Sequence, residues 1–344
     1  MILAAGLGTR LRPLTYVMPK PVAPVLNRPI VARIAELLEQ HGFDRVVTNV
    51  SYLPEQIREV LGDGSEFGLE VTYSDEPEPL GTAGGVGKVR DFLSESDSFL
   101  IISGDALTDI DLSAMREAHE ANVANGAIAT LATKRVEDTT QFGVAITDAE
   151  GRISGFQEKP DPAEALSDLA NCGIYMFRRE IFDHFPSPDH KSPAGDEDQP
   201  AGFVDWAMDV FPALLDGDVP FYSHEIDAYW NDIGSVAEFV QGNLDALTGS
   251  VRIAPPGSQV SEGTYAGEGS DLDGVKVTPP VLIGADCHLG EAVDLHGPVV
   301  IGDGCELGAG ALLRDCVVLP GAEVAPGALV VGGLYGISAD RPLG

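Results

Sequence analysis

Two series of residues with a period of six, in the last quarter of the chain, place the strongest constraint on its fold. Aliphatic residues recur every six positions, and small or β-branched residues follow four positions after most of them. An α-helix and a flat strand have other periods, so neither produces this spacing. The pattern therefore predicts a parallel β-helix built of hexapeptides. The first series is Val277, Ile283, Leu289, Leu295, Ile301, Leu307, Leu313 and Leu319, and the second is Cys287, Val293, Val299, Cys305, Ala311 and Val317.

The chain before residue 250 follows a different pattern. Apolar, strand-like runs at 45–50, 69–73 and 99–103 alternate with amphipathic stretches at 54–61 and 112–122. This alternation predicts an α/β fold with a Rossmann-like, doubly wound and mainly parallel sheet. We therefore expect two domains, one over residues 1–250 and a β-helix over residues 251–344. Further elements are expected as a hairpin at 142–158, an exposed loop at 186–202, and helices at 203–215 and 235–247.

The charge balance limits the classes of partner. With 54 acidic and 21 basic residues the net charge is −33, which excludes nucleic acid because its phosphates would be repelled. The lysines are few, and an acidic, lysine-poor surface favours a salt-rich cytoplasm; an acidic protein of an ordinary cytoplasm remains the alternative. No apolar run is long enough to span a membrane, and the four cysteines lack metal-site spacing. We expect a cytoplasmic protein without a membrane partner.

A glycine-rich loop follows the first apolar stretch. Gly6 and Gly8 are followed by Arg10 and Lys20, so open backbone N–H groups lie beside cationic side chains. Such a loop suits a polyphosphate. It is not a dinucleotide-binding fingerprint, because Leu11 stands near the position where a third glycine is needed.

The segment from Leu3 to Pro29, with Pro-Lys-Pro at 19–21, resembles the signature loop of the sugar-1-phosphate nucleotidylyltransferases. The resemblance implies that a nucleoside triphosphate (NTP) and a sugar 1-phosphate react to give a nucleotide sugar and pyrophosphate. The repeats resemble the left-handed hexapeptide-repeat helix, in which three hexads complete one coil. Residues 277–331 would then form about three coils, and the last is expected to be a cap because the register fails after Leu319.

The family's motifs imply roles for individual positions. Arg10, Lys20 and Lys159 would be catalytic: Arg10 at the α-phosphate, Lys20 on pyrophosphate and Lys159 on the sugar phosphate. The loop 76–85 would recognise the nucleobase, with glycines that let a flat base approach the backbone. The residues that would bind the nucleotide are Leu3, Ala5, Gly6, Gly8, Thr9, Gly81, Thr82, Gly84 and Gly104.

Two carboxylates suit a divalent cation. Asp105 follows the strand 99–103, and Asp232 lies in the stretch Tyr-Trp-Asn-Asp-Ile-Gly at 229–234. In the family these positions share the Mg²⁺ that bridges the nucleotide phosphates. The alternative for Asp232 is that it only caps the helix that follows.

A Glu-Lys-Pro motif follows the expected hairpin. The resemblance implies that Glu158 contacts sugar hydroxyls, that Lys159 holds the sugar phosphate, and that Gly143, Asn171 and Gly173 belong to the same subsite. The alternative for Asn171 and Gly173 is a turn at the entry of a strand.

The amino-acid sequence of the loop 76–85 indicates a branch of the family. Leu-Gly-Thr-Ala-Gly at 80–84 is most similar to the mannose-1-phosphate guanylyltransferases, and so are the stretches 49–56 and 229–234. Glucose-1-phosphate uridylyl- or thymidylyltransfer remains an alternative, as do a glycosyltransferase of related fold and a non-catalytic regulatory subunit. The DxD at Asp109 and Asp111 could indicate a glycosyltransferase, but its position before a helix favours capping. We expect a homo-oligomer, and we expect the segment 277–331 to contact either another subunit or the first domain.

Overall fold

The computed structural model describes residues 1–187, 189–195 and 198–336. The chain forms two compact units. Unit 1 comprises Met1–Gly6, Ile34–Ala106 and Ile110–Trp230, and unit 2 comprises Leu7–Arg33, Leu107–Asp109 and Asn231–Gly344, described up to residue 336. Gly8 of the glycine-rich loop therefore belongs to the same unit as the β-helix, whereas Gly6 belongs to unit 1. The domain boundary near residue 250 stays a prediction.

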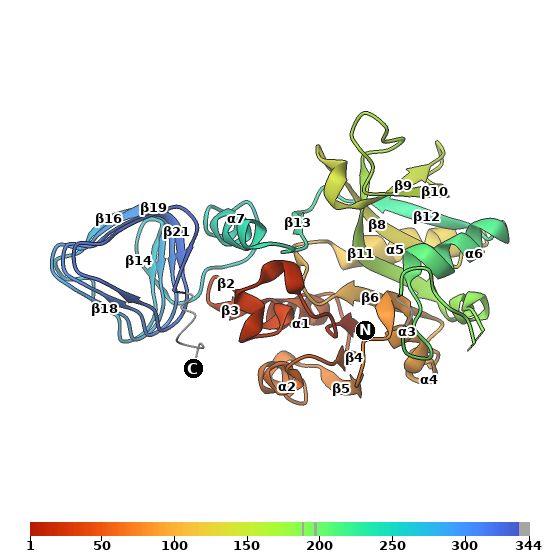
Figure 1. Ribbon diagram of the computed structural model, residues 1–344, viewed down its shortest axis with the longest axis horizontal. Helices are drawn as coiled ribbons and strands as arrows, with labels where there is room; N and C mark the ends of the chain where they lie inside the picture. The colour runs from red at the N-terminus through yellow and green to blue at the C-terminus, as the bar shows by residue number, and fades with distance from the viewer. Residues whose placement is uncertain (188, 196–197, 337–344) are drawn as a thin grey trace. The chain divides into compact units, whose positions relative to one another are not determined.

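Unit 1 is built on a mixed, nine-stranded sheet, which confirms the α/β class (Figure 1). Its central strands are parallel, in the order β6-β1-β4-β5, and β11 joins antiparallel to β6. The expected hairpin is formed by β9 and β10. The strands are β1 (Ile2–Leu3), β4 (Arg45–Val50), β5 (Glu70–Asp75), β6 (Ser98–Ser103), β8 (Ala129–Arg135), β9 (Gly143–Thr147), β10 (Ile153–Glu158), β11 (Leu169–Arg178) and β12 (Phe221–Glu225).

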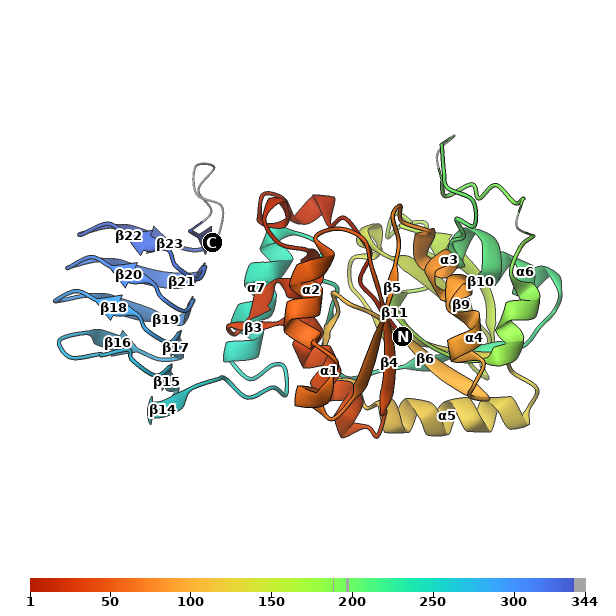
Figure 2. The same cartoon turned by 90° about the horizontal axis from the view of Figure 1, so that it is seen from below.

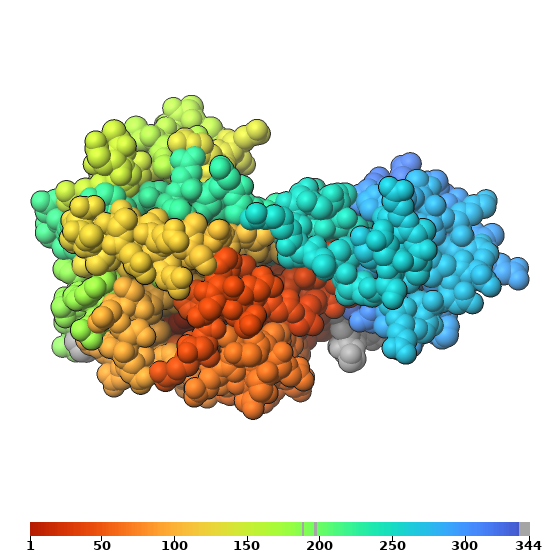
Figure 3. Space-filling model, turned by 180° about the vertical axis from the view of Figure 1, so that it is seen from behind, coloured from red at the N-terminus to blue at the C-terminus, as the bar shows by residue number. Residues whose placement is uncertain are grey.

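Helices cover this sheet, and one of them differs from the prediction. Asp205 caps a π-helical turn at Trp206–Val210, after which α6 begins, so the helix expected at 203–215 starts later and is irregular. α5 packs on β8 and exposes its other side at the surface of unit 1 (yellow in Figure 3). The helices are α2 (Pro54–Leu61), α3 (Gly81–Lys88), α4 (Arg90–Leu93), α5 (Leu112–Ala124) and α6 (Phe211–Asp216), with short turns η4 (Ser65–Phe67), η5 (Thr139–Gln141), η6 (Arg179–His184) and η7 (Trp206–Val210).

An aromatic cluster forms the core between the sheet and α6. The rings of Phe177 and Trp206 stack with centroids 4.6 Å apart, and Tyr175 meets Phe211 edge to face at 5.7 Å. These side chains are buried, and burial of large apolar area is the main source of stability in such a core. The cluster fixes the 202–211 segment against the sheet.

In unit 2 the chain after Gly6 runs through short 3₁₀ turns into a hairpin. The turn of this hairpin has Leu26 and Asn27 at φ 47° and 56°. The elements are η1 (Thr9–Leu11), η2 (Leu14–Tyr16), η3 (Lys20–Val22), β2 (Pro24–Val25), β3 (Arg28–Pro29) and the start of α1 (Ile30–Gln40), followed after the long excursion through unit 1 by α7 (Val236–Leu247); β7 (Leu107–Thr108) and β13 (Trp230–Asn231) are short strands.

The predicted β-helix is present as stacked parallel strands (Figure 2). Leu295 pairs with Leu313, and Ile283 with Ile301, so the coil repeats every 18 residues, or three hexads. Cys287 and Cys305 are buried in its core. The strands are β14 (Ser258–Ser261), β15 (Thr264–Ala266), β16 (Lys276–Thr278), β17 (Val281–Ile283), β18 (His288–Leu289), β19 (Asp294–Ile301), β20 (Glu306–Leu307), β21 (Leu312–Val318), β22 (Glu323–Val324), β23 (Leu329–Val331) and β24 (Leu334–Tyr335).

The six-residue register fails earlier than predicted. Ile301 pairs with Val318, not with Leu319, because the β21 strand is one residue shorter than β19 after Leu313. Asp315, with φ 51°, lies in this shortened stretch. The sequence pattern missed the shift because Leu319 is also buried.

Candidate active site

The carboxyl ends of three parallel strands meet at one edge of the unit 1 sheet. Leu3 lies in register with Asn49 on one side and Ser103 on the other. The Gly104 N–H donates to the Leu3 carbonyl at 2.8 Å, and a Cβ on Gly104 would lie 2.7 Å from that oxygen. Gly104 is therefore required for this close approach. It places Asp105 at the same edge as Leu3, where ligands bind in such sheets.

The part of the glycine-rich loop that belongs to unit 2, from residue 7 onward, is closed by local contacts. Gly8 has φ 61°, and the Thr15 hydroxyl donates to its carbonyl at 2.8 Å. A Cβ at Gly8 would lie 3.1 Å from Cβ of Lys20, whose side chain is buried. The first 3₁₀ turn begins at Thr9, and Arg10 is its second residue. Lys20 is thus packed under the loop, whereas Arg10 is exposed.

Arg10 and Asp232 come together within unit 2. Arg10 Nη2 lies 3.9 Å from Asp232 Oδ2. Asp232 does not cap α7: the cap is Ser235, whose hydroxyl accepts from the Glu238 N–H at 3.2 Å. The structural alternative for Asp232 is therefore wrong. Ile233, with φ 47°, donates its N–H to the Asn231 side chain and fixes the turn that presents Asp232.

The Glu-Lys-Pro motif ends β10. Lys159 has φ 47°, a strained conformation for a side chain of this size, and its N–H donates to the Phe142 carbonyl at 3.0 Å. Gly143 is opposite Glu158 in the hairpin, and a Cβ there would lie 2.9 Å from Glu158 Oε2. Lys159 Nζ is 3.6 Å from Glu158 Oε1. The hairpin therefore brings Gly143, Glu158 and Lys159 together.

Asn171 and Gly173 lie inside β11, not in a turn before it. The register between β11 and β8 shifts between Asn171 and Tyr175, which marks a β-bulge. Asn171 Oδ1 accepts from the Gly173 N–H at 3.1 Å. Gly173 has φ 68°, and a Cβ would lie 2.6 Å from Ser103 Oγ. The bulge thus sits beside the carboxyl end of β6.

The glycines of the loop 76–85 have a packing role that the sequence did not reveal. A Cβ on Gly81 would lie 2.5 Å from the Val204 carbonyl, and one on Gly84 would lie 2.3 Å from the Gly202 carbonyl. The Thr82 hydroxyl donates to Asp205 at 2.8 Å. The segment 202–205 therefore packs directly on α3. No periodic signal links two segments this far apart in the sequence.

The carboxylates fit the implied Mg²⁺ by their donor chemistry. Mg²⁺ prefers oxygen ligands and is commonly held by one or two carboxylates together with substrate phosphates. Over the described ranges no group of three or more His, Cys, Asp or Glu residues could hold a metal on its own. Asp105 belongs to unit 1 and Asp232 to unit 2. Because Ser235 caps α7, the oxygens of Asp232 are not needed at the helix end.

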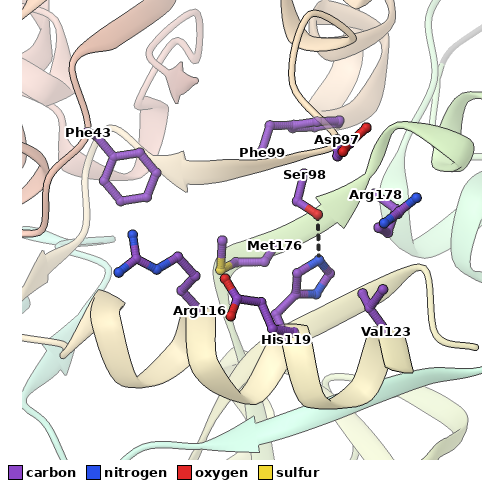
Figure 4. A pocket seen from close by; sticks show the side chains of 10 residues that line it. Phe43, Asp97, Ser98, Phe99, Arg116, His119, Val123, Met176 and Arg178 are labelled. Carbon is purple, nitrogen blue, oxygen red and sulfur yellow. Dashed lines mark hydrogen bonds between the residues drawn. The ribbon is translucent and has the colours of Figure 1, made fainter. Parts of the chain in front are cut away.

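A pocket of about 410 Å³ lies elsewhere in unit 1, between α5 and the amino end of β6 (Figure 4). Its wall includes His119, which is fully buried and lies 3.2 Å from Ser98 Oγ and 3.1 Å from Thr130 Oγ1. Burial lowers the pKa of His119 to about 4, so the ring is neutral at pH 7. The pocket contains none of the predicted site residues. His119 is a core histidine with satisfied nitrogens.

The two carboxylates of the DxD sequence have structural partners. Asp111 caps α5 by accepting from the Ala114 N–H at 2.9 Å, as predicted. Asp109 accepts from Arg252 Nε at 3.0 Å. In the part of the chain that the structure describes, no helix is both long and apolar enough to cross a membrane.

Comparison with known proteins agrees with these motifs. The family model described as nucleotidyl transferase matches residues 1–249. The chain is 38% identical to UTP–glucose-1-phosphate uridylyltransferase of Synechocystis sp., over 96% of this chain and 85% of the relative. It is 34% identical to mannose-1-phosphate guanylyltransferase of Mycobacterium tuberculosis, over 96% of this chain and 82% of the relative.

Solved structures show the same fold. A Bacillus anthracis protein solved in complex with sucrose has a TM-score of 0.61 and 25% identity, over 74% of this chain and 96% of that chain. HddC from Yersinia pseudotuberculosis has a TM-score of 0.57 at 23% identity, over 70% of this chain and 96% of that chain. The family match and the relatives agree in reaction class and leave the substrate open. The chain belongs to the nucleotidyl transferase family and is a sugar-1-phosphate nucleotidylyltransferase.

Proposed function

We propose that the protein transfers GMP from GTP to mannose 1-phosphate, giving GDP-mannose and pyrophosphate. The observation that carries this choice is the nucleobase loop, Leu-Gly-Thr-Ala-Gly at 80–84. Relatives named as mannose-1-phosphate guanylyltransferases, at 34% and 31% identity, support it. A second candidate is uridylyl transfer to glucose 1-phosphate, which the 38% identical Synechocystis relative favours.

One experiment decides between these substrates. Each of GTP, UTP, dTTP, ATP and CTP is incubated with mannose 1-phosphate or glucose 1-phosphate, and pyrophosphate release is measured. We expect GTP with mannose 1-phosphate to give the highest kcat/KM. The highest value for UTP with glucose 1-phosphate would replace the first candidate by the second.

The chemistry proposed for the site needs no strong general base. An oxygen of the sugar 1-phosphate, already ionised, attacks the α-phosphorus of the NTP. The bond between that phosphorus and the oxygen bridging to the β-phosphate breaks, and pyrophosphate leaves with the electron pair. Catalysis then depends on alignment of the two phosphates and on neutralisation of their charge.

Cationic side chains are proposed to supply much of that neutralisation. Arg10 would stabilise charge at the α-phosphate, Lys20 would bind the departing pyrophosphate, and Lys159 would hold the attacking phosphate, with Glu158 and Asn171 on the sugar. The exposed Arg10 and the strained Lys159 support these roles. Lys20 is buried under the loop, so its role requires the ammonium to reach the loop's open side.

The divalent ion is proposed to be Mg²⁺, which the family typically uses. When bound, it would supply positive charge that lowers the mutual repulsion of the nucleotide phosphates. Asp105 and Asp232 would hold it, and Asp232→Asn should reduce Mg²⁺-dependent turnover by at least a hundredfold without loss of fold. Retained Mg²⁺-dependent turnover in that variant would remove Asp232 from the metal site.

The cellular setting and the assembly are also proposals. The charge of −33 supports a salt-rich cytoplasm, and the β-helix offers strand edges for contacts between copies of the chain. We propose a homo-oligomer and the domain division 1–250 and 251–344. Light scattering of the full chain tests the oligomeric state.

A further inference from the structure

A buried hydrogen-bond network joins two loops of unit 1 that the proposed function assigns to the NTP. Asn49 Oδ1 accepts from the Ala4 N–H at 2.8 Å, and Asn49 Nδ2 donates to Glu76 Oε1 at 2.8 Å. Glu76 Oε2 accepts from the Leu80 N–H at 3.0 Å. Asn49 and Glu76 are each 3% exposed. The two side chains thus connect the backbone after β1 to the backbone before α3.

The topology explains why these positions meet. Asn49 is near the end of β4 and faces Leu3 in the neighbouring strand β1. Glu76 follows β5, the next strand in the sheet, and its N–H donates to the Val50 carbonyl at 2.8 Å. Both side chains therefore leave the carboxyl edge of adjacent parallel strands, which is the ligand-binding edge of such a sheet.

The network occupies space that one glycine provides. A Cβ on Gly85 would lie 2.3 Å from Glu76 Oε1 and 2.8 Å from Asn49 Nδ2. Burial of a carboxylate is costly unless donors surround it, and Glu76 receives an amide N–H and a backbone N–H that leads into α3. A buried acid maintained in this way is well suited to fix a loop.

We infer that Asn49 and Glu76 are positioning residues for the NTP. Ala4 precedes Ala5 and Gly6, and Leu80 precedes Gly81 and Thr82, so the network holds the phosphate side and the nucleobase side of the nucleotide at one fixed spacing. This inference rests on the proposed function. The residues proposed for the sugar phosphate lie on the β9–β10 hairpin and on β11, outside the network.

Exchange of the acid and the amide tests the network. Glu76→Gln leaves one donor facing another, because Leu80 still requires an oxygen and Asn49 Nδ2 then meets an amide nitrogen. Asn49→Asp places two carboxylates side by side, and their repulsion should disturb the network more than the mismatched hydrogen bond in Glu76→Gln. In the double variant N49D/E76Q every hydrogen bond can be remade. The carboxylate introduced at position 49 accepts from the Ala4 N–H and from the amide introduced at position 76, and the oxygen of that amide accepts from the Leu80 N–H.

The readout is steady-state pyrophosphate release with separate KM values for the two substrates. We expect E76Q and N49D to raise the KM for the NTP roughly tenfold or more, since a lost bond to a charged group costs about that factor. The KM for the sugar 1-phosphate should change less than about twofold. The double variant should recover most of the NTP affinity.

A matched control and a direct binding measurement separate a failure of this inference from a failure of the proposed function. Glu66→Gln makes the same change on an exposed glutamate of unit 1 that lies outside the loop 76–85, and it should leave both KM values unchanged. The dissociation constant of the NTP, measured by calorimetry with Mg²⁺, should follow its KM in all variants. If wild type releases no pyrophosphate with any substrate pair, the proposed function fails.

If wild type is active, the inference fails in either of two cases. In the first, the single variants lower the thermal midpoint but keep the NTP KM, which indicates a structural role only. In the second, both KM values rise together and the double variant does not restore them. Circular dichroism of each variant identifies any that does not fold, and the cycle is then completed with Asn49→Ser and its combination with E76Q.

Discussion

Residues with strained backbone conformations lie at the proposed site. Lys159 and Ile233 both have positive φ, at 47°. A left-handed conformation costs a non-glycine residue about 1–2 kcal/mol, so neighbouring contacts must hold each of them. Those contacts are the Phe142 carbonyl for Lys159 and the Asn231 side chain for Ile233. The strained conformations thus lower the stability of the fold at Lys159 and at the turn that presents Asp232.

Two cationic residues should show different kinetic signatures. Lys159→Ala should mainly raise the KM for sugar 1-phosphate, and Arg10→Ala should mainly lower kcat, because one binds the attacking group and the other the developing charge. Each loss should cost on the order of 2–4 kcal/mol of transition-state stabilisation. Initial rates over both substrate concentrations measure this, with Lys276→Ala on the β-helix as a control. Impaired NTP binding alone in Lys159→Ala would contradict its assignment.

His119 should make the fold sensitive to mild acid. Its pKa is about 4 in the folded protein and 6.5 in an ordinary setting, so the unfolded chain binds more protons between these values. The stabilising contribution is therefore complete above pH 6.5 and is lost as the pH falls toward 4, up to about 3 kcal/mol. Urea unfolding of wild type and His119→Gln between pH 5 and 8 measures it. Equal slopes in both proteins would contradict the assignment.

The sequence predicted site residues where a motif is local and missed them where the contact is distant. Gly143, Glu158 and Lys159 meet because one hairpin holds them. The Asn49–Glu76 pair could not be predicted, since a single hydrogen bond across adjacent strands leaves no periodic pattern. The packing role of Gly81 was missed for the same reason, because its neighbour Val204 comes from a segment interpreted partly as a regular helix.

At the level of elements, the β2–β3 hairpin bonds both to α7 and to the β-helix within unit 2. Asn243 of α7 is fully buried, and its Oδ1 accepts from the Leu26 N–H at 2.9 Å. Asn27 Nδ2 donates to the Ile301 carbonyl of β19 at 2.8 Å. The hairpin follows Lys20 in the chain. The β-helix therefore supports the segment that carries the glycine-rich loop.

Loss of the Asn243 amide should weaken this support. Asn243→Leu leaves the Leu26 N–H without its partner in a buried setting, which should destabilise the fold by about 1–3 kcal/mol. Gln241→Leu removes an exposed amide from the same helix and serves as the control. Urea unfolding midpoints report the difference. Equal midpoints in the two variants would show that the hairpin does not depend on α7.

The β-helix was the element most open to prediction from sequence. Its core positions repeat because each coil stacks on the next, so Ile283, Ile301 and their equivalents share one environment. The sequence did not predict that β21 is one residue shorter near Asp315. The buried Leu319 still fits the six-residue period, although the strand pairing has already shifted by one residue.

For the whole molecule, charge is the dominant feature. With a net charge of −33, repulsion between carboxylates opposes the compact state in dilute buffer, and salt screens it. The thermal midpoint should therefore rise steeply from low to molar KCl. Scanning calorimetry across that range measures it, with an isosmotic sucrose series as the control. A midpoint that stays flat or falls with KCl would contradict a salt-adapted protein.

The fate of the α-phosphate of the NTP tests nucleotidyl transfer most directly. With GTP labelled at that position and mannose 1-phosphate present, the label should enter the nucleotide sugar while one pyrophosphate is released per product formed, and glucose 1-phosphate with labelled UTP repeats the test for the second candidate. Without a sugar phosphate the label should stay in the NTP. Release of orthophosphate, or label in a free nucleoside diphosphate, would contradict nucleotidyl transfer by this site.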